Sequence, residues 1–174
     1  MRIISGSHKG RRLIAPASLP VRPTTDRAKE ALFNILENRY YFENKNLLDL
    51  FSGTGNIAFE FSSRGAEHIT TVDSNNNCVN FIKKTSSDLE LNITSLKSDC
   101  IKYLESCEKQ FNIIFADPPY NFAEHKKIKE IIFERDLVKK DGCLIIEHDS
   151  STSFEDDNVE VRKYGTVHFS IFSF

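Results

Sequence analysis

The chain has 174 residues, of which 40% are hydrophobic and 28% charged, and its formal net charge is −2. These values are typical of one globular domain that folds unaided, and they exclude a disordered or fibrous chain. No apolar stretch is long enough to cross a bilayer and no charged-then-apolar leader opens the chain, so we expect a cytoplasmic protein without a membrane partner. The cysteines at 78, 100, 107 and 143 lack the spacing of a metal site, so we expect buried reduced thiols and no bound metal.

Positive charge is concentrated at the start of the chain. Residues 1–30 contain seven Lys and Arg residues against two acids, a local charge of +5, whereas the other 144 residues contain 16 bases and 23 acids. A basic end on an acidic body predicts a localised contact with a polyanion, although a solvated tail would show the same composition. The candidates for binding phosphates are Lys9, Arg11, Arg12, Arg22 and Arg27.

A hairpin and a helix are expected before the main domain. Residues 2–4 and 11–14 have the pattern of two short paired strands. Three prolines then favour an extended course across residues 15–24. Apolar residues at helical spacing predict an amphipathic helix over residues 26–38, which would lie on the main domain. Lys29 lies on the first turns of this helix, as Arg27 does, and either could face a ligand or the substrate.

From residue 44 onward, strand and helix patterns alternate, which predicts a mainly parallel sheet covered on both faces. Strands are expected at residues 46–50, 68–72, 93–97, 111–116 and 142–147, and helices at about 56–64, 75–88, 100–106 and 124–134. Residues 159–162 and 167–172 are separated only by a turn, so the sheet should close with an antiparallel hairpin. We therefore expect an α/β fold in which residues 1–43 form a basic appendage and residues 44–174 form the main domain.

A glycine-rich turn follows the strand at residues 46–50. Gly53 and Gly55 let the backbone approach a ligand closely, and the next helix presents free N–H groups there. The same pattern also suits a nicotinamide cofactor. Asp49 favours S-adenosylmethionine, because a carboxylate attracts its ammonium group but repels a pyrophosphate. Phe51 lies in the same turn and is included in the expected cofactor site.

Two more carboxylates end the next two strands. Asp73 lies where a carboxylate can accept hydrogen bonds from both ribose hydroxyls of a bound adenosine. Asp99, followed by Cys100, could meet the adenine amino group. Each of these aspartates could instead cap a helix. Because the carboxyl ends of parallel strands meet at one edge of a sheet, Asp49, Asp73 and Asp99 together indicate a cofactor site.

A rigid polar corner, Asp117-Pro118-Pro119-Tyr120, follows the apolar run 111–116. An exocyclic amine on a nucleobase is a poor nucleophile, because its lone pair is shared with the ring. Hydrogen bonds from the amine to Asp117 and to the carbonyl of Pro118 would free that lone pair. Pro119 fixes the backbone, and Tyr120 can stack on the base and hold it in line with a methyl donor. These four residues therefore predict catalysis of N-methylation by direct displacement.

Together these residues resemble the bacterial 16S ribosomal RNA guanine-N2 methyltransferases of the RsmD type. The similar segments are residues 1–6, 9–13, 22–36, 48–58 and 64–66, with Asp73 and the corner at 117–120. The resemblance implies a class I, Rossmann-like methyltransferase fold with a mainly parallel seven-stranded sheet and an antiparallel last strand. It also implies S-adenosylmethionine as methyl donor and a guanine N2 of 16S ribosomal RNA in the small ribosomal subunit as target, usually guanosine 966. We expect a monomer.

Three other functions share part of this pattern. A DNA adenine-N6 methyltransferase uses the same corner, but such enzymes generally carry a target-recognition region for which 174 residues leave little room. A nicotinamide-dependent oxidoreductase shares the glycine turn, but it does not explain Asp49, Asp117 or the basic hairpin. An RNA-binding assembly factor without catalysis does not explain an intact corner.

Overall fold

The computed structural model describes residues 1–17, 19, 25–156 and 158–174. In chain order the elements are α1 (Asp26–Glu37), β1 (Asn46–Leu50), α2 (Asn56–Ser63), β2 (His68–Asp73), α3 (Asn76–Asp88), β3 (Ile93–Lys97), α4 (Cys100–Ser106), β4 (Phe111–Ala116), α5 (His125–Glu134), β5 (Val138–His148), β6 (Val159–Tyr164) and β7 (Val167–Ser173). The helices and strands expected from the sequence are present with ends within two residues, except that β5 begins four residues earlier than expected. Arg22, a predicted phosphate-binding residue, lies outside the described residues.

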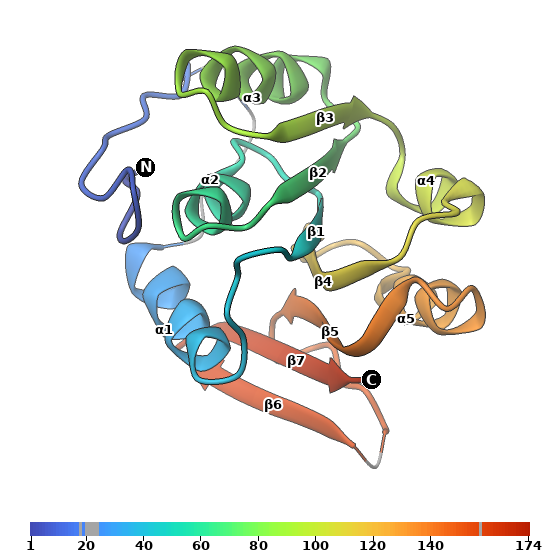
Figure 1. The fold of residues 1–174 in the computed structure, drawn as a ribbon. Coiled ribbons are helices and arrows are strands. Elements are labelled where there is room, and N and C mark those ends of the chain that lie inside the picture. Colours follow the sequence, from blue (N-terminus) through green and yellow to red (C-terminus); the bar gives the residue numbers. More distant parts are fainter. Residues whose placement is uncertain (18, 20–24, 157) are drawn as a thin grey trace.

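The strands form one sheet in the order β3-β2-β1-β4-β5-β7-β6 (Figure 1). Neighbours among β1 to β5 pair in parallel, and β7 pairs antiparallel with both β5 and β6. The turn between β6 and β7 contains Gly165, whose φ of 64° is accessible to glycine without strain. The predicted class I, Rossmann-like sheet with an antiparallel last strand is therefore confirmed.

Helices cover both faces of the sheet (Figure 1). One face packs against α1 and α2, where the rings of Phe33 and Phe61 meet edge to face with centroids 4.5 Å apart. The other face packs against α4 and α5 through residues such as Leu104 and Ile132. Full burial of one such side chain contributes about 1.5–3 kcal/mol. These contacts fix the strand ends that carry the predicted site.

The predicted N-terminal hairpin is present, but it is shorter than two paired strands. The Ile3 N–H donates to the Arg11 carbonyl at 2.9 Å and the Gly10 N–H donates to the Ile3 carbonyl at 2.9 Å, around a single bridge. Gly6 has a φ of 80°, and a side chain there would collide with the backbone of α2. The extended course expected after the hairpin is wrong where the chain is described, because the Leu19 N–H donates to the Pro16 carbonyl and closes a turn.

The hairpin is held to the main domain by Glu60 of α2, whose side chain is fully buried. Its two carboxylate oxygens accept the backbone N–H groups of Ile4 at 2.8 Å and Ser5 at 3.0 Å. The same carboxylate forms ion pairs with Lys29 at 3.2 Å and Arg64 at 2.8 Å. Two cations and two backbone donors therefore compensate one buried negative charge.

Lys29 has a structural position rather than one facing a ligand. Its ammonium group is buried and donates to the Arg2 carbonyl at 2.7 Å and to the side chain of Asn56 at 2.8 Å. Burial lowers the pKa of Lys29, and the neighbouring Glu60 opposes that shift. The lysine thus joins α1, α2 and the hairpin, whereas Arg27 on the same helix is exposed.

Candidate active site

The glycine turn between β1 and α2 is tied to the end of β2. The Ser52 N–H donates to the Val72 carbonyl at 3.2 Å, and the Gly53 N–H donates to Asp73 Oδ2 at 2.7 Å. Gly55 precedes the first turn of α2 with a φ of 75°, and a Cβ there would lie 2.9 Å from the ring of Phe59. The turn therefore requires glycine, and it presents the N-terminus of α2 at the carboxyl edge of the sheet.

Asp73 lies beside this turn, as expected from the sequence. Besides Gly53, its carboxylate accepts the Asn75 N–H on Oδ1 at 2.7 Å. The side chain is partly exposed, and each carboxylate oxygen retains a further lone pair. Its orientation is therefore fixed by the backbone, which is what binding a pair of hydroxyls requires. Its role toward a ribose stays a prediction.

Replacing Asp73 with alanine is expected to weaken cofactor binding by at least about tenfold, because one charge-assisted hydrogen bond contributes roughly 1.5–3 kcal/mol. Isothermal titration with S-adenosylhomocysteine measures this loss directly. Asp88→Ala, at the exposed end of α3, is the matched control and should keep the Kd of the unchanged protein. An unchanged Kd for Asp73→Ala would contradict the assignment.

Asp49 is buried on β1, with 3% of its surface exposed. The Ala58 backbone N–H hydrogen-bonds to its carboxyl group, while Oδ2 has no hydrogen-bond partner among the described residues. Burial first, and then the charges of Asp117 and Asp73, raise the pKa of Asp49 well above its ordinary value. A buried acceptor that lacks a donor fits the ammonium group of S-adenosylmethionine, which would supply both a donor and a positive charge.

Asp99 and Cys100 lie at the start of α4. Asp99 is exposed and caps the helix by accepting the Lys102 N–H at 3.1 Å, so the capping role considered from the sequence is real. The thiol of Cys100 is buried in the core, and burial raises its pKa. Any ligand contact of Cys100 would therefore come from its backbone N–H in the first helical turn. A role for both residues toward adenine stays a prediction.

Phe51 adopts a left-handed backbone, with a φ of 57°. This conformation is an outlier for an aromatic residue and costs about 1–3 kcal/mol, which the surrounding packing must offset. The ring of Phe51 meets that of Phe122 edge to face, with centroids 5.1 Å apart. Since Phe122 follows the Asp-Pro-Pro-Tyr corner, this contact joins the glycine turn to the corner.

The corner directly follows β4, next to β1. The Asp117 N–H donates to the Leu50 carbonyl at 3.3 Å, and the Phe122 N–H donates to the Pro119 carbonyl at 2.7 Å. Pro118 is buried, whereas Tyr120 is 49% exposed. The backbone of the corner is thus anchored at both ends, and Tyr120 is partly open to solvent. This arrangement suits a half-buried carboxylate beside a base-stacking ring.

Glu147, at the end of β5, was not identified from the sequence as a site residue. It is 3% exposed, and burial together with the charge of Asp117 raises its pKa to about 9. The signal that could have revealed it is an acidic residue directly after the apolar run Leu144-Ile145-Ile146. A charged residue in such a strand is rarely buried without a partner or a function.

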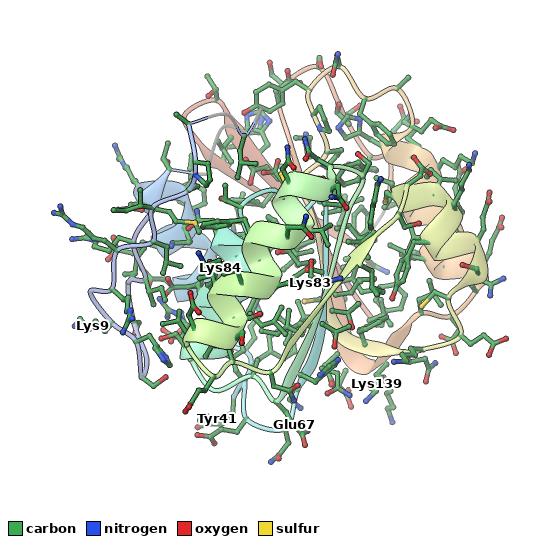
Figure 2. All side chains as sticks on the ribbon, turned by 90° about the horizontal axis from the view of Figure 1, so that it is seen from above. Lys9, Tyr41, Glu67, Lys83, Lys84 and Lys139 are labelled. Atoms are coloured by element: carbon green, nitrogen blue, oxygen red, sulfur yellow. The ribbon has the colours of Figure 1, made fainter. Side chains whose placement is uncertain are left out.

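The predicted phosphate-binding residues Lys9, Arg11, Arg12 and Arg27 are all exposed. Lys9 lies at the outer edge of the molecule (Figure 2). A cavity of about 390 Å³ is lined by residues of both the hairpin and the glycine turn, among them Arg12 and Thr54. Arg12 therefore lines the same cavity as the glycine turn, while Lys9 lies on the periphery.

No group of three or more potential metal ligands lies close together within the described ranges. Among the same residues, no helix combines the length and apolarity needed to cross a membrane. The four cysteines are buried and unpaired.

The strand order, the antiparallel β7, the glycine turn and the carboxylates at the strand ends define a class I methyltransferase. The family model described as conserved hypothetical protein 95 matches residues 1–173. The chain belongs to this family, and its resemblance to the RsmD type is confirmed by the comparisons with individual relatives.

Ribosomal RNA small subunit methyltransferase D of Escherichia coli is 34% identical over 148 residues, which cover 84% of this chain and 74% of that protein. The provisionally named rRNA methyltransferase YlbH of Bacillus subtilis is 36% identical over 182 residues, covering 99% of this chain and 98% of the relative. A solved structure of a hypothetical protein from Thermus thermophilus has a TM-score of 0.86 at 25% identity, with 98% of each chain covered.

Proposed function

We propose that this protein transfers a methyl group from S-adenosylmethionine to the exocyclic N2 of a guanine in 16S ribosomal RNA, at guanosine 966 of the small subunit. The observation that carries the proposal is the closeness of two carboxyl groups, Asp49 on β1 and Asp117 directly after the neighbouring strand β4. Asp49 has an unpartnered buried oxygen suited to an ammonium group, and Asp117 begins a corner suited to an aromatic amine. The names of the relatives support ribosomal RNA of the small subunit as the substrate.

The cofactor would bind across the carboxyl ends of β1, β2 and β3. Asp49 would hold the ammonium group, Asp73 the ribose hydroxyls, and the backbone of Gly53 and Gly55 would approach the ligand closely. Asp99 and the Cys100 N–H would meet the adenine. When bound, S-adenosylmethionine supplies an electrophilic methyl group on a sulfonium sulfur.

The corner would prepare the substrate amine. Asp117 and the carbonyl of Pro118 would accept its two N–H groups, which favours a pyramidal nitrogen with an available lone pair. Tyr120 would stack on the base and exclude water from one face. Asp117 would accept a hydrogen bond from the nitrogen, so it would be the first acceptor for the proton that the nitrogen must lose after methylation.

The N-terminal hairpin would bind RNA phosphates. It belongs to the basic segment of residues 1–43, and residues 44–174 would form the catalytic domain. Lys9, Arg11 and Arg12 are exposed on the hairpin, and Lys84 is exposed on α3, against which the hairpin packs (Figure 2). Because the hairpin is anchored at Glu60, these charges are held at a fixed position relative to the glycine turn. We propose that the protein acts as a monomer in the cytoplasm.

Reversing the charge of Arg11 and Arg12 to glutamate is expected to raise the KM for small subunits and to flatten its dependence on salt, since each lost phosphate contact reduces the salt slope by about one. Steady-state kinetics at several salt concentrations measure both quantities. The matched control is a double variant on β5, Lys139→Glu with Lys140→Glu, because it changes the net charge by the same amount. Equal salt slopes in the two double variants would contradict a local RNA contact.

The proposed reaction is tested by incubating the protein with labelled S-adenosylmethionine and unmodified small subunits, followed by nucleoside mass spectrometry. N2-methylguanosine is the expected product. Methylated adenosine as the only product, or no transfer by a protein that binds the cofactor, would contradict the proposal.

Calorimetry with NAD and with S-adenosylhomocysteine separates an oxidoreductase from a methyltransferase. Only S-adenosylhomocysteine is expected to bind.

A further inference from the structure

Three carboxyl groups lie close together at the carboxyl edge of the sheet. In the parallel register, Asp49 of β1 is opposite Phe115 of β4, and Phe115 is opposite Ile145 of β5. Asp117 and Glu147 each lie two residues beyond those partners. Since side chains alternate between the faces of a strand, Asp49 and Glu147 project to the same side. Asp117, the first residue after β4, lies near both, because its charge raises the pKa of each.

Glu147 is enclosed in this group. Its cross-strand partner on β7 is Phe169, which is fully buried and has no charge. Glu147 Oε2 has no hydrogen-bond partner among the described residues. A buried carboxyl group beside a carboxylate is more stable with its proton, because ionisation would add a second negative charge in a medium of low polarity. The raised pKa of Glu147 agrees with this argument from its position.

Among the described residues, few charged or titratable groups lie around Glu147. The charge of Asp117, the first residue after β4, raises the pKa of Glu147, and Asp49 lies on β1, one strand further on the same face. The adjacent His148 projects to the other face, where its ring meets Phe154 and His168, so the histidines do not face Glu147. The protonation of Glu147 is therefore controlled mainly by burial and by Asp117.

We propose that Glu147 is a positioning residue for methyl transfer: as a neutral carboxylic acid it donates a hydrogen bond to Asp117. That bond keeps Asp117 ionised and turned toward the substrate amine. Glu147 then holds a proton, while Asp117 accepts a hydrogen bond from the amine. The inference rests on the proposed role of Asp117, but it does not depend on which base carries the amine.

The test compares pH profiles of kcat for the unchanged protein, Glu147→Gln and Glu147→Ala. In the unchanged protein kcat should fall as the pH rises through about 9, where Glu147 loses its proton. Glutamine keeps an N–H donor at every pH, so Glu147→Gln should retain activity and lose this part of the alkaline decline. Alanine removes the donor, and kcat should fall by about tenfold or more at neutral pH with little change in cofactor KM. Ionisation of guanine itself affects all three proteins equally.

Stability provides a folding control. The folded-state pKa of Glu147 is raised, so the buried carboxyl group penalises the folded state increasingly above its unfolded pKa and up to about pH 9. Glu147→Gln lacks this penalty and should have a higher Tm than the unchanged protein at neutral pH. The matched control is Glu67→Gln at the opposite end of the sheet, where the side chain is exposed, and it should change neither Tm nor kcat.

An infrared difference spectrum between the unchanged protein and Glu147→Gln reports on the proton directly. At neutral pH the unchanged protein should show the carbonyl band of a protonated carboxylic acid that the variant lacks. Absence of that band, identical alkaline declines of kcat in the unchanged protein and Glu147→Gln, or equal losses of kcat in the glutamine and alanine variants would each overturn the inference.

Activity is counted as total methyl transfer to RNA. A product other than N2-methylguanosine therefore contradicts the proposed function alone, whereas no transfer by the unchanged protein contradicts both.

Discussion

Replacing Asp117 with alanine is expected to lower kcat by at least about 100-fold, the usual loss when one electrostatic contact to the transition state is removed. The alanine methyl group cannot accept an N–H of the substrate amine, so the nitrogen lone pair stays shared with the ring. The Kd for S-adenosylhomocysteine should remain within a few-fold, because the proposed contact of Asp117 is with the substrate amine and not with the cofactor. Single-turnover methyl transfer and calorimetry on the same preparation measure the two effects.

Two controls define what this result means. Asp117→Asn keeps one carbonyl acceptor but loses the charge, so its kcat should lie between those of the alanine variant and the unchanged protein. Asp88→Ala on α3 should be fully active, because the side chain is exposed and remote from the carboxyl edge. Full activity of Asp117→Ala, or loss of cofactor binding as large as the loss of kcat, would refute the assigned role.

Replacing Glu60 with alanine is expected to destabilise the fold by about 3–5 kcal/mol, the range measured when one partner of a buried ion pair is removed. The change would leave the buried cations Lys29 and Arg64 without their shared partner. It would also leave the N–H groups of Ile4 and Ser5 without an acceptor. Urea unfolding followed by circular dichroism gives the free energy of unfolding.

Glu60→Gln separates charge from hydrogen bonding, because glutamine retains one carbonyl acceptor but no charge. Glu30→Ala on the exposed side of α1 is the matched control and should change stability by less than about 0.5 kcal/mol. A loss below about 1 kcal/mol for Glu60→Ala would mean that the hairpin is held by its apolar residues instead. In that case Ile3 and Leu13, which pack on α2 and α3, would be the anchors.

The sequence predicted the parts of this molecule that depend on local pattern. The apolar run 111–116 and the glycine turn with Gly53 and Gly55 are local signals, so the strand and the turn were identified with nearly correct ends. The early start of β5 was missed because Val138 is followed by three polar residues, Lys139, Lys140 and Asp141, which interrupt the apolar pattern. Backbone pairing with β4 begins there nevertheless, with an irregular register after Phe111.

Contacts between distant residues could not be predicted in the same way. Glu60 reads as a solvent-facing residue of α2, and only the docked hairpin, 56 residues earlier at Ile4, makes it a buried anchor. Glu147 becomes a candidate only when the register places it beside Asp117. Lys29 could equally have faced a ligand. In each case the chemistry of a polar side chain depends on elements far away in sequence.

The long separation between Ile4 and Glu60 also sets an order of assembly during synthesis. The basic hairpin is made before its anchor, which lies 56 residues later, and Ser63, which hydrogen-bonds to Ser5, is further still. Until α2 has been synthesised, the hairpin has no surface on which to dock. Its positive charges are therefore exposed on an unanchored nascent chain, and they gain a fixed position only when the centre of the sheet begins to form.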